Sequence, residues 1–118
     1  MERGEAWLVD AHGCDPERLR SREALDSLFG ALVRDLRLNP LGPARWHEFP
    51  GTGGITGFLL LSESHLALHT FPETGFAALD LYCCRRLEGW SWEEGLKKHL
   101  GAGSVVLHRV PRGEAGGA

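Results

Sequence analysis

The chain has 118 residues, of which 42% are hydrophobic and 25% are charged, and it carries a net charge of −3 at pH 7. This length suits one domain with a single core, and the ordinary composition excludes disordered, collagen-like and small disulfide-scaffold proteins. The acidic net charge excludes the basic surface of a nucleic-acid binder. The sequence shows neither a signal peptide nor an apolar run of ~18 to 20 residues, which predicts a cytoplasmic protein without membrane association.

The first third of the chain predicts a strand followed by helical structure. Residues 6–12 (AWLVDAH) are typical of a strand, and Asp15-Pro16 has the polar cap and first-position proline of a helix start. From Ser21 to Leu38 the apolar residues recur with the 3.6-residue period of an amphipathic helix. Asn39-Pro40 is expected to stop this helix.

The remainder of the chain predicts mainly strands, at residues 44–49, 55–62, 65–71, 75–84 and 104–110. A second helix is expected from Ser91 to Leu100, with Ser91 as its cap and Glu94 at the capping-box position. The order β-α-β-β-β-β-α-β predicts an α+β fold, an antiparallel sheet with two helices packed on one face as a two-layer α/β sandwich.

Alternation along two of these strands predicts the two faces of the sheet. Leu66 and Leu68 point one way in residues 65–71, and the leucines of residues 75–84 are expected to share that helix-covered face. The other face gathers titratable side chains, namely His65, His69, Asp80, Tyr82 and Cys84. Such a face is solvated, buried in a dimer or an active site, and the pattern alone leaves these alternatives open.

Several features of this face have simple interpretations. His65 and His69 on one strand are about 13 Å apart, too far to share one ion, so we predict no metal site there. Three cysteines without an export signal predict reduced thiols, with Cys83 in the packing and Cys84 as the reactive candidate. Ser64, in the connection before residues 65–71, is either a turn former or a nucleophile toward the preceding carbonyl.

One long segment resembles a known family. The stretch LLLSESHLALHTFPETGFAALDLYCC (residues 59–84) resembles the bacterial and archaeal S-adenosylmethionine decarboxylase proenzymes, a pyruvoyl-dependent family. The matching elements are Ser62-Glu63-Ser64-His65, His69-Thr70, Pro72-Glu73, Gly75, Asp80 and Cys84. The early WLVDAHGCD segment also fits, so that the resemblance covers roughly residues 6–110.

The resemblance implies a precursor that cleaves itself between Glu63 and Ser64, giving chains 1–63 and 64–118 from a single domain of residues 1–118. Ser64 would become the pyruvoyl group, which takes the substrate amine in a Schiff base and acts as the electron sink of decarboxylation. His69 matches the processing base. Thr56 stands where the family commonly has a processing serine.

The resemblance also implies a substrate site. Cys84 matches the catalytic proton donor, Glu73 the residue that binds the ribose hydroxyls, and Phe49 and Phe71 the aromatic positions that hold adenine. The expected activity is decarboxylation of S-adenosylmethionine to the aminopropyl donor of polyamine synthesis, by a homodimer of cleaved protomers. The alternatives are a pyruvoyl-dependent arginine or ornithine decarboxylase, or an unprocessed regulatory paralogue.

Overall fold

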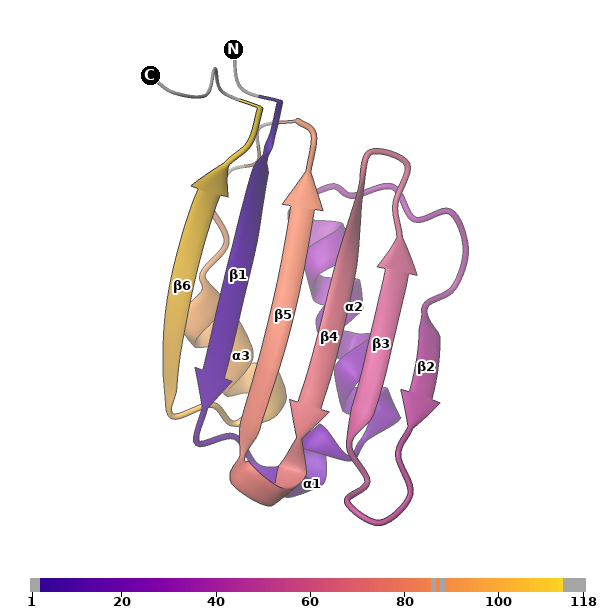
Figure 1. Ribbon diagram of the computed structural model, residues 1–118, viewed down its shortest axis with the longest axis vertical. Helices are drawn as coiled ribbons and strands as arrows, with labels where there is room; N and C mark the ends of the chain where they lie inside the picture. The colour runs from indigo at the N-terminus through magenta and orange to yellow at the C-terminus, as the bar shows by residue number, and fades with distance from the viewer. Residues whose placement is uncertain (1–2, 86, 88, 114–118) are drawn as a thin grey trace.

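Six antiparallel strands form one sheet, in the order β2-β3-β4-β5-β1-β6 across it (Figure 1). The structure is a computed structural model and describes residues 3–85, 87 and 89–113. The strands are β1 (Glu5–His12), β2 (Arg45–Glu48), β3 (Ile55–Leu60), β4 (Ser64–Phe71), β5 (Phe76–Cys83) and β6 (Ser104–Pro111). The helices are α1 (Pro16–Leu19), α2 (Arg22–Asp35) and α3 (Trp92–Leu100), with a short 3-10 turn η1 (Pro72–Thr74).

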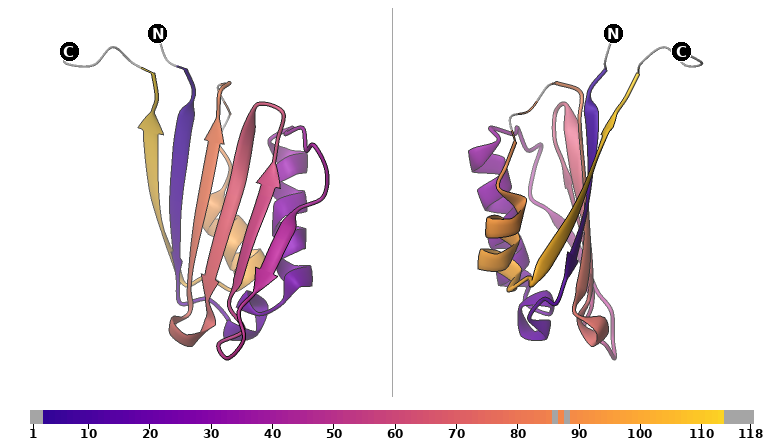
Figure 2. Two further views of the ribbon diagram at one scale, coloured as in Figure 1. Left: turned by 45° about the vertical axis from the view of Figure 1, so that its right-hand side comes forward. Right: turned by 90° about the vertical axis from the view of Figure 1, so that its left-hand side faces the viewer.

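The helices cover one face of the sheet and leave the other face open (Figure 2). This is the predicted two-layer arrangement, with the short α1 added to the two longer helices. The core lies between the layers and is built largely from fully buried leucines, including Leu25, Leu28, Leu32, Leu66, Leu68, Leu79, Leu81 and Leu96. Burial of each such side chain contributes roughly 1.5 to 3 kcal/mol, so this layer packing supplies most of the fold's stability.

The predicted helix start at Asp15-Pro16 is confirmed, but the helical segment that follows is divided into α1 and α2, because Ser21 begins a second helix. Asp15 caps α1 by accepting the Glu17 N–H at 3.0 Å, and Pro16 is the first helical residue. Ser21 caps α2 by accepting the Ala24 N–H at 3.1 Å. Each cap satisfies a backbone donor that has no partner within its own helix.

The predicted end of α2 is wrong by about one turn, because the helix stops at Asp35 and not at Leu38. Arg37 takes a left-handed φ of 54°, and the Leu38 N–H donates to the Val33 carbonyl at 2.9 Å. This is the hydrogen bond of a Schellman motif, which closes a helix and folds the next apolar residue back onto it. Leu38 is buried for that reason. A buried apolar residue at this position made the helical period of the sequence appear to continue beyond the true end of the helix.

The start of α3 also differs from the expectation. Ser91 occupies the cap position, but its side chain makes no capping hydrogen bond, so the predicted capping box with Glu94 is not formed. Two tryptophans hold the entry to the helix instead. Trp90 and Trp92 meet edge to face with their ring centroids 5.0 Å apart, and the Trp92 N–H donates to the Trp90 carbonyl at 2.9 Å. Tertiary packing has replaced the local cap.

Across the described parts of the chain, none of the helices combines the length and apolar character needed to cross a membrane.

Candidate active site

The predicted site residues lie in two groups at opposite ends of β4. Where β4 begins (the β3–β4 hairpin in Figure 1), Glu63 and Ser64 lie beside Cys84, which directly follows β5; we call these three residues the hairpin group. Where β4 ends, near η1, lies what we call the η1 group: Phe49, Thr56, His69, Phe71 and Glu73.

The β3–β4 hairpin has a loop of only two residues, Ser62 and Glu63. Leu61 and Ser64 exchange both of their backbone hydrogen bonds across it, at 3.0 and 3.4 Å. The expected tight connection is therefore present, but Ser64 is the first residue of β4 and not part of the turn. The sequence-based start of this strand at His65 was one residue too late.

Within the hairpin group, a buried hydroxyl lies next to a carbonyl that accepts a hydrogen bond. The Ser64 side-chain oxygen is buried and has no hydrogen-bond partner among the described residues. The carbonyl oxygen of Glu63 accepts a hydrogen bond from the Cys84 backbone N–H at 3.2 Å. An N–H donor on a carbonyl oxygen stabilises the negative charge that develops there when a nucleophile adds to the carbonyl carbon. The arrangement can therefore support attack by Ser64 on the preceding peptide bond.

The Glu63 side chain is held by polar groups of three residues, namely its neighbour Ser62 and, from other parts of the chain, Asn39 and Arg85. Its Oε2 accepts hydrogen bonds from the Ser62 hydroxyl and from Nδ2 of Asn39, the latter at 3.2 Å, while its Oε1 is buried 3.8 Å from Nη2 of Arg85. The pKa of Glu63 is lowered below its usual range, mainly by the Ser62 hydrogen bond and further by the Asn39 hydrogen bonds and the charge of Arg85. Burial has the opposite effect but does not outweigh them. The carboxyl group is therefore ionised at neutral pH.

Asn39 and Arg85 are absent from the sequence-based list of site residues. Asn39 was interpreted only as part of a helix stop, although its carbonyl also accepts the Ser62 N–H at 2.9 Å. Arg85 carries no motif signal, since a single arginine after a strand is usually a solvated side chain. Only the three-dimensional closeness of the α2 end to the hairpin reveals either residue.

In the η1 group, the two predicted processing side chains are in contact. Thr56 and His69 are direct cross-strand partners of β3 and β4, and the Thr56 hydroxyl lies 3.1 Å from Nδ1 of His69. A hydroxyl at this distance fixes the orientation of the imidazole ring and can exchange a proton with it. The pair has the geometry required of a general base and its orienting hydroxyl.

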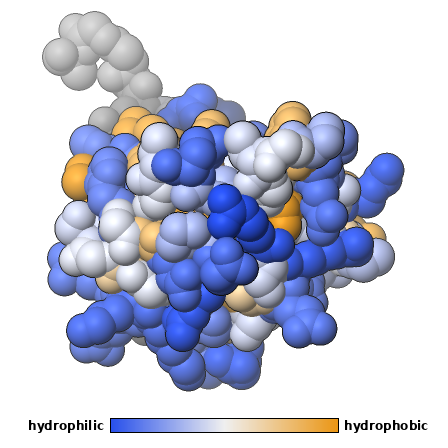
Figure 3. Space-filling view, turned by 90° about the horizontal axis from the view of Figure 1, so that it is seen from below, coloured by the Kyte–Doolittle hydropathy of each residue, from blue (hydrophilic) through white to orange (hydrophobic). Residues whose placement is uncertain are grey.

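The aromatic members of the η1 group are unusually exposed. Phe49 is 48% exposed and lies edge-on to His47, with ring centroids 4.6 Å apart. Phe71 is 44% exposed and lies beside Phe76, and Glu73 is an exposed residue of η1. Seen from below, this end of the molecule is mainly hydrophilic with isolated hydrophobic side chains (Figure 3). An exposed phenyl ring can stack on a flat ring, and an exposed carboxylate can accept hydrogen bonds from polar substituents.

The two groups are too far apart to act on each other within one chain. His69 is the fifth residue after Ser64 along β4, which corresponds to about 16 Å in a strand. General-base catalysis needs hydrogen-bond reach between the base and the proton it removes, directly or through one water. Within one chain, the predicted base His69 therefore does not come within hydrogen-bond reach of Ser64.

The burial of Cys83 and the exposure of Cys84 agree with the sequence-based expectation. Cys83 is buried on the helix-covered face, whereas Cys84 is exposed beyond the end of β5. Cys14 is also buried, and burial raises its pKa to about 11. Cys84 is thus the only one of the three whose thiol solvent and ligands can reach.

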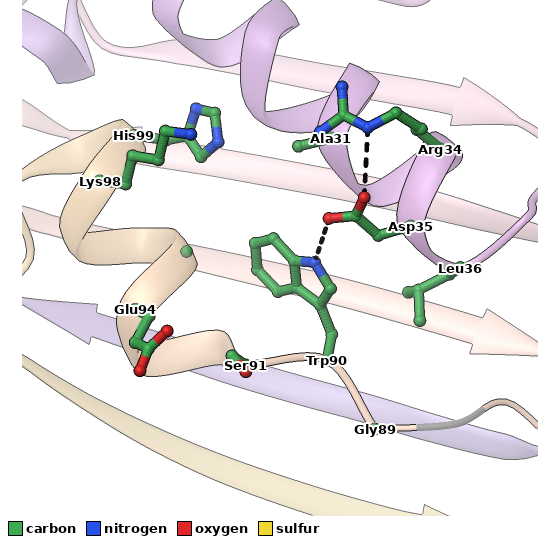
Figure 4. A pocket seen from close by; sticks show the side chains of 11 residues that line it. Ala31, Arg34, Asp35, Leu36, Gly89, Trp90, Ser91, Glu94, Lys98 and His99 are labelled. Atoms are coloured by element: carbon green, nitrogen blue, oxygen red, sulfur yellow. Dashed lines mark hydrogen bonds and ion pairs between the residues drawn. The ribbon is translucent and has the colours of Figure 1, made fainter.

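A pocket on the helix side of the sheet is separate from both groups. It lies between α2 and α3 and is lined by Arg34, Asp35, Trp90, Glu94, Lys98 and His99, among others (Figure 4). No predicted site residue is among the described residues that line it. Burial, followed by the charges of Lys98 and Arg34, lowers the pKa of His99.

Comparison with known proteins gives one consistent result. A profile of the S-adenosylmethionine decarboxylase family matches residues 5–113. The S-adenosylmethionine decarboxylase proenzyme of Caldicellulosiruptor saccharolyticus is 30% identical, covering 93% of this chain and 88% of its own. That of Geobacillus sp. strain WCH70 is 32% identical, covering 93% and 87%. The crystal structure of the adenosylmethionine decarboxylase from Aquifex aeolicus VF5 superposes with a TM-score of 0.78 over 99% of this chain and 96% of the other, at 24% identity.

Proposed function

The chain belongs to the S-adenosylmethionine decarboxylase family, and from that premise we propose that it cleaves itself between Glu63 and Ser64 and then decarboxylates S-adenosylmethionine. The observation that carries the proposal is the hairpin group. A buried Ser64 hydroxyl, which has no hydrogen-bond partner in the described part of the chain, directly follows a carbonyl that accepts the Cys84 N–H. The proenzyme name of the relatives is in keeping with a precursor that processes itself.

The cleavage chemistry uses only groups of the chain and water. The Ser64 hydroxyl adds to the Glu63 carbonyl carbon, the peptide C–N bond breaks, and the hydroxyl proton passes to the Ser64 nitrogen, which leaves an ester. Loss of the Ser64 Cα proton then breaks the Cβ–Oγ bond and releases Glu63 as a carboxylate. Tautomerisation and hydrolysis of residue 64, with loss of ammonia, leave a ketone in place of an amino terminus. No oxidant or reductant is needed.

The residues around Ser64 fit the pyruvoyl group that this chemistry would produce. The Ser64 side-chain oxygen is buried and makes no hydrogen bond among the described residues, so its loss removes none of the hydrogen bonds found there. When present, a pyruvoyl group supplies the electron sink that a decarboxylating amino acid requires. The exposed Cys84 thiol, adjacent in space, is the proposed donor of a proton to the substrate α-carbon.

Substrate binding is assigned to the η1 group. Phe49 and Phe71 present exposed rings for stacking on adenine, and these rings also attract the positive sulfonium. The Glu73 carboxylate, exposed in η1, accepts hydrogen bonds from the ribose hydroxyls. The relatives described above carry the S-adenosylmethionine name, so an arginine or ornithine substrate is not favoured.

The separation of the two groups supports a homodimer. The open face of the sheet carries exposed apolar side chains of a kind that a partner would cover, namely Leu8, Phe58, Leu60, Val106 and Val110. A two-fold axis between two such faces, running across the strands, would reverse one protomer relative to the other. The hairpin group of each protomer would then meet its partner's η1 group. His69 would serve Ser64 of the other chain.

Intact mass under denaturing conditions tests the proposed function. The purified wild-type protein should appear as two chains, residues 1–63 and 64–118, with a ketone at the start of the second. The Ser64→Ala variant should remain one chain, since it lacks the nucleophile. A wild-type chain that stays whole for days would reject the proposal and favour the regulatory alternative. A cleaved protein that releases no CO₂ from S-adenosylmethionine would reject the substrate alone.

A further inference from the structure

Arg85 connects the cleavage hairpin to the end of α2. Its Nη2 donates to the Arg37 carbonyl at 2.6 Å and to the Leu36 carbonyl at 3.2 Å, and lies 3.8 Å from Oε1 of Glu63. Carbonyl groups at the C-terminus of a helix lack partners within the helix and carry partial negative charge, so they favour a cation. The guanidinium therefore contacts a helix end on one side and a carboxylate on the other.

The helix end that anchors Arg85 is itself held in place. Asp35, the last residue of α2, accepts the indole N–H of Trp90 at 3.0 Å and pairs with Arg34 at 3.2 Å (Figure 4). The Trp90 hydrogen bond, followed by the effects of Arg34, lowers the pKa of Asp35, in keeping with an ionised carboxylate here. The Arg37 and Leu36 carbonyls, which accept hydrogen bonds from the guanidinium, are thus held in a fixed position.

The consecutive residues Cys84 and Arg85 contact the backbone and the side chain of Glu63, respectively. The Cys84 N–H donates to its backbone carbonyl at 3.2 Å, and Arg85 faces its side-chain carboxylate. Asn39 holds the same turn from the other direction, by donating to Oε2 of Glu63 and accepting the Ser62 N–H. The Glu63 side chain is only 16% exposed, and its Oε1 has no hydrogen bond among the described residues. Arg85 therefore provides that oxygen with a charge partner but no hydrogen bond.

We propose that Arg85 is a positioning residue for self-cleavage, which holds the Glu63 side chain and neutralises its charge while the Glu63 main chain departs as a carboxylate. The inference rests on the proposed function and deepens it, because it assigns a role to a residue outside the motif stretch of residues 59–84. Asn39 assists by fixing the other carboxylate oxygen.

The charge balance of the elimination explains why a cation is needed. When the Ser64 Cα proton is removed, the Cβ–Oγ bond breaks and its electron pair leaves with the new Glu63 carboxylate. Residue 63 then carries two negative charges, one on its side chain and one on its main chain. Two like charges on one residue repel each other in a partly buried site. Neutralising the side chain lowers the energy of the departing group.

The test is a time course of chain cleavage by intact mass, with the full-length precursor purified soon after expression. Arg85→Gln keeps a hydrogen-bond donor for the α2 carbonyls but removes the charge, and Arg85→Lys keeps the charge. We expect Arg85→Gln to slow cleavage by about tenfold or more, and Arg85→Lys to recover much of the rate. Thermal unfolding of each variant reports whether the fold is retained.

Arg18 offers a matched control. Its Nη1 donates to the Lys98 carbonyl near the end of α3 at 2.6 Å, so it makes the same kind of contact far from the hairpin. Arg18→Gln should leave the cleavage rate within about twofold of wild type. If Arg85→Gln cleaves as fast as Arg18→Gln, Arg85 is only a helix cap and the inference is overturned.

A double-mutant comparison and a chemical trap test the charge argument. In a Glu63→Gln chain no side-chain charge remains to be neutralised, so adding Arg85→Gln should cause little further loss. Hydroxylamine cleaves esters, and Arg85→Gln should accumulate more hydroxylamine-sensitive precursor than wild type. Equal losses from Arg85→Gln with and without Glu63→Gln would overturn the inference while leaving the proposed function intact. A wild-type chain that never cleaves would overturn both.

Discussion

The Thr56 hydroxyl lies 3.1 Å from Nδ1 of His69, directly across the ladder between β3 and β4. The family resemblance places a serine at residue 56, and the extra methyl of threonine raised the question of whether the hydroxyl could still act. The contact shows that the methyl group does not prevent the hydroxyl from reaching the ring. The hydroxyl, and not the residue type, is therefore the group whose removal should matter.

We expect Thr56→Ser to cleave itself within about twofold of the wild-type rate and Thr56→Val to slow by at least about tenfold, since valine keeps the shape but loses the hydroxyl. The measurement is the fraction of cleaved chain against time by intact mass. Thr52→Ala is the control, because Thr52 lies in the loop before β3 and its hydroxyl contacts only the Gly54 N–H among the described residues. Equal rates for Thr56→Val and wild type would remove Thr56 from the processing chemistry.

The separation of His69 from Ser64 along β4 makes a prediction about mixed dimers. Neither Ser64→Ala nor His69→Ala should cleave at an appreciable rate when expressed alone. Co-expressed with different affinity tags, the two variants should form dimers in which the His69→Ala chain is cleaved, because the Ser64→Ala chain supplies the histidine. Cleavage of the tagged His69→Ala chain by mass is the readout. No cleavage in purified mixed dimers would show that the histidine acts within its own chain.

The strand pattern was largely predictable because alternation and burial follow directly from the pleat. Leu66, Leu68 and Leu79 are buried against the helices as their positions in the strands required. The errors lie where tertiary contacts override local signals. Leu38 lies in the Schellman turn, but in the sequence it looked like the last apolar residue of the helix. Ser91 is a typical capping residue, but it makes no capping hydrogen bond because the tryptophan packing holds the start of α3.

The candidate site was predictable only in the part that a contiguous segment encodes. Residues 59–84 carried Ser64, His69 and Cys84 together in the sequence, yet the fold sets the first two about 16 Å apart. Asn39, which follows α2, contacts one carboxylate oxygen of Glu63, and Arg85, which is anchored on the end of α2, lies near the other. No local pattern reports such a contact, because it depends on where a helix stops relative to a turn.

The thiols should differ in reactivity because only Cys84 is exposed. A thiol reagent at neutral pH should modify one cysteine per folded chain, and peptide mapping should locate it at Cys84. Cys14, with a pKa of about 11, should react only after unfolding. Cys84→Ser should still cleave itself but lose most decarboxylation, since the N–H that contacts Glu63 belongs to the backbone. Loss of self-cleavage in this variant would instead give the thiol a role in processing.

The exposed Phe71 and Glu73 should determine substrate affinity and not processing. Phe71→Ala should raise KM for S-adenosylmethionine by about tenfold through lost stacking on adenine, and Phe71→Trp should restore or improve it. Glu73→Gln should lower kcat/KM by roughly tenfold to a hundredfold, because the ribose hydroxyls lose a charged acceptor. All three variants should cleave themselves normally. A KM unchanged by Phe71→Ala would place the adenine elsewhere.

The hydrogen bonds that lower the pKa of Glu63 also predict how the uncleaved precursor responds to pH. A carboxyl group whose pKa is lowered in the folded state stabilises that state above its ordinary pKa of 4.5, and the contribution disappears as the pH falls through the lower folded value. The Ser64→Ala chain should therefore unfold at a higher temperature than Ser64→Ala with Glu63→Gln at pH 7, by about 3 °C or more.

That difference in Tm should stay constant from pH 7 to about pH 5 and shrink below pH 4.5, because only the chain with Glu63 loses a stabilising ionised group there. Glu17→Gln in the Ser64→Ala chain is the control. It removes a carboxyl group that is 84% exposed and that, among the residues with described positions, pairs only with Arg20 at the surface of α1, away from the hairpin. A Glu63 difference that is independent of pH would mean that the side chain stabilises the hairpin by packing and not by its charge, which would also weaken the case for Arg85 as its partner.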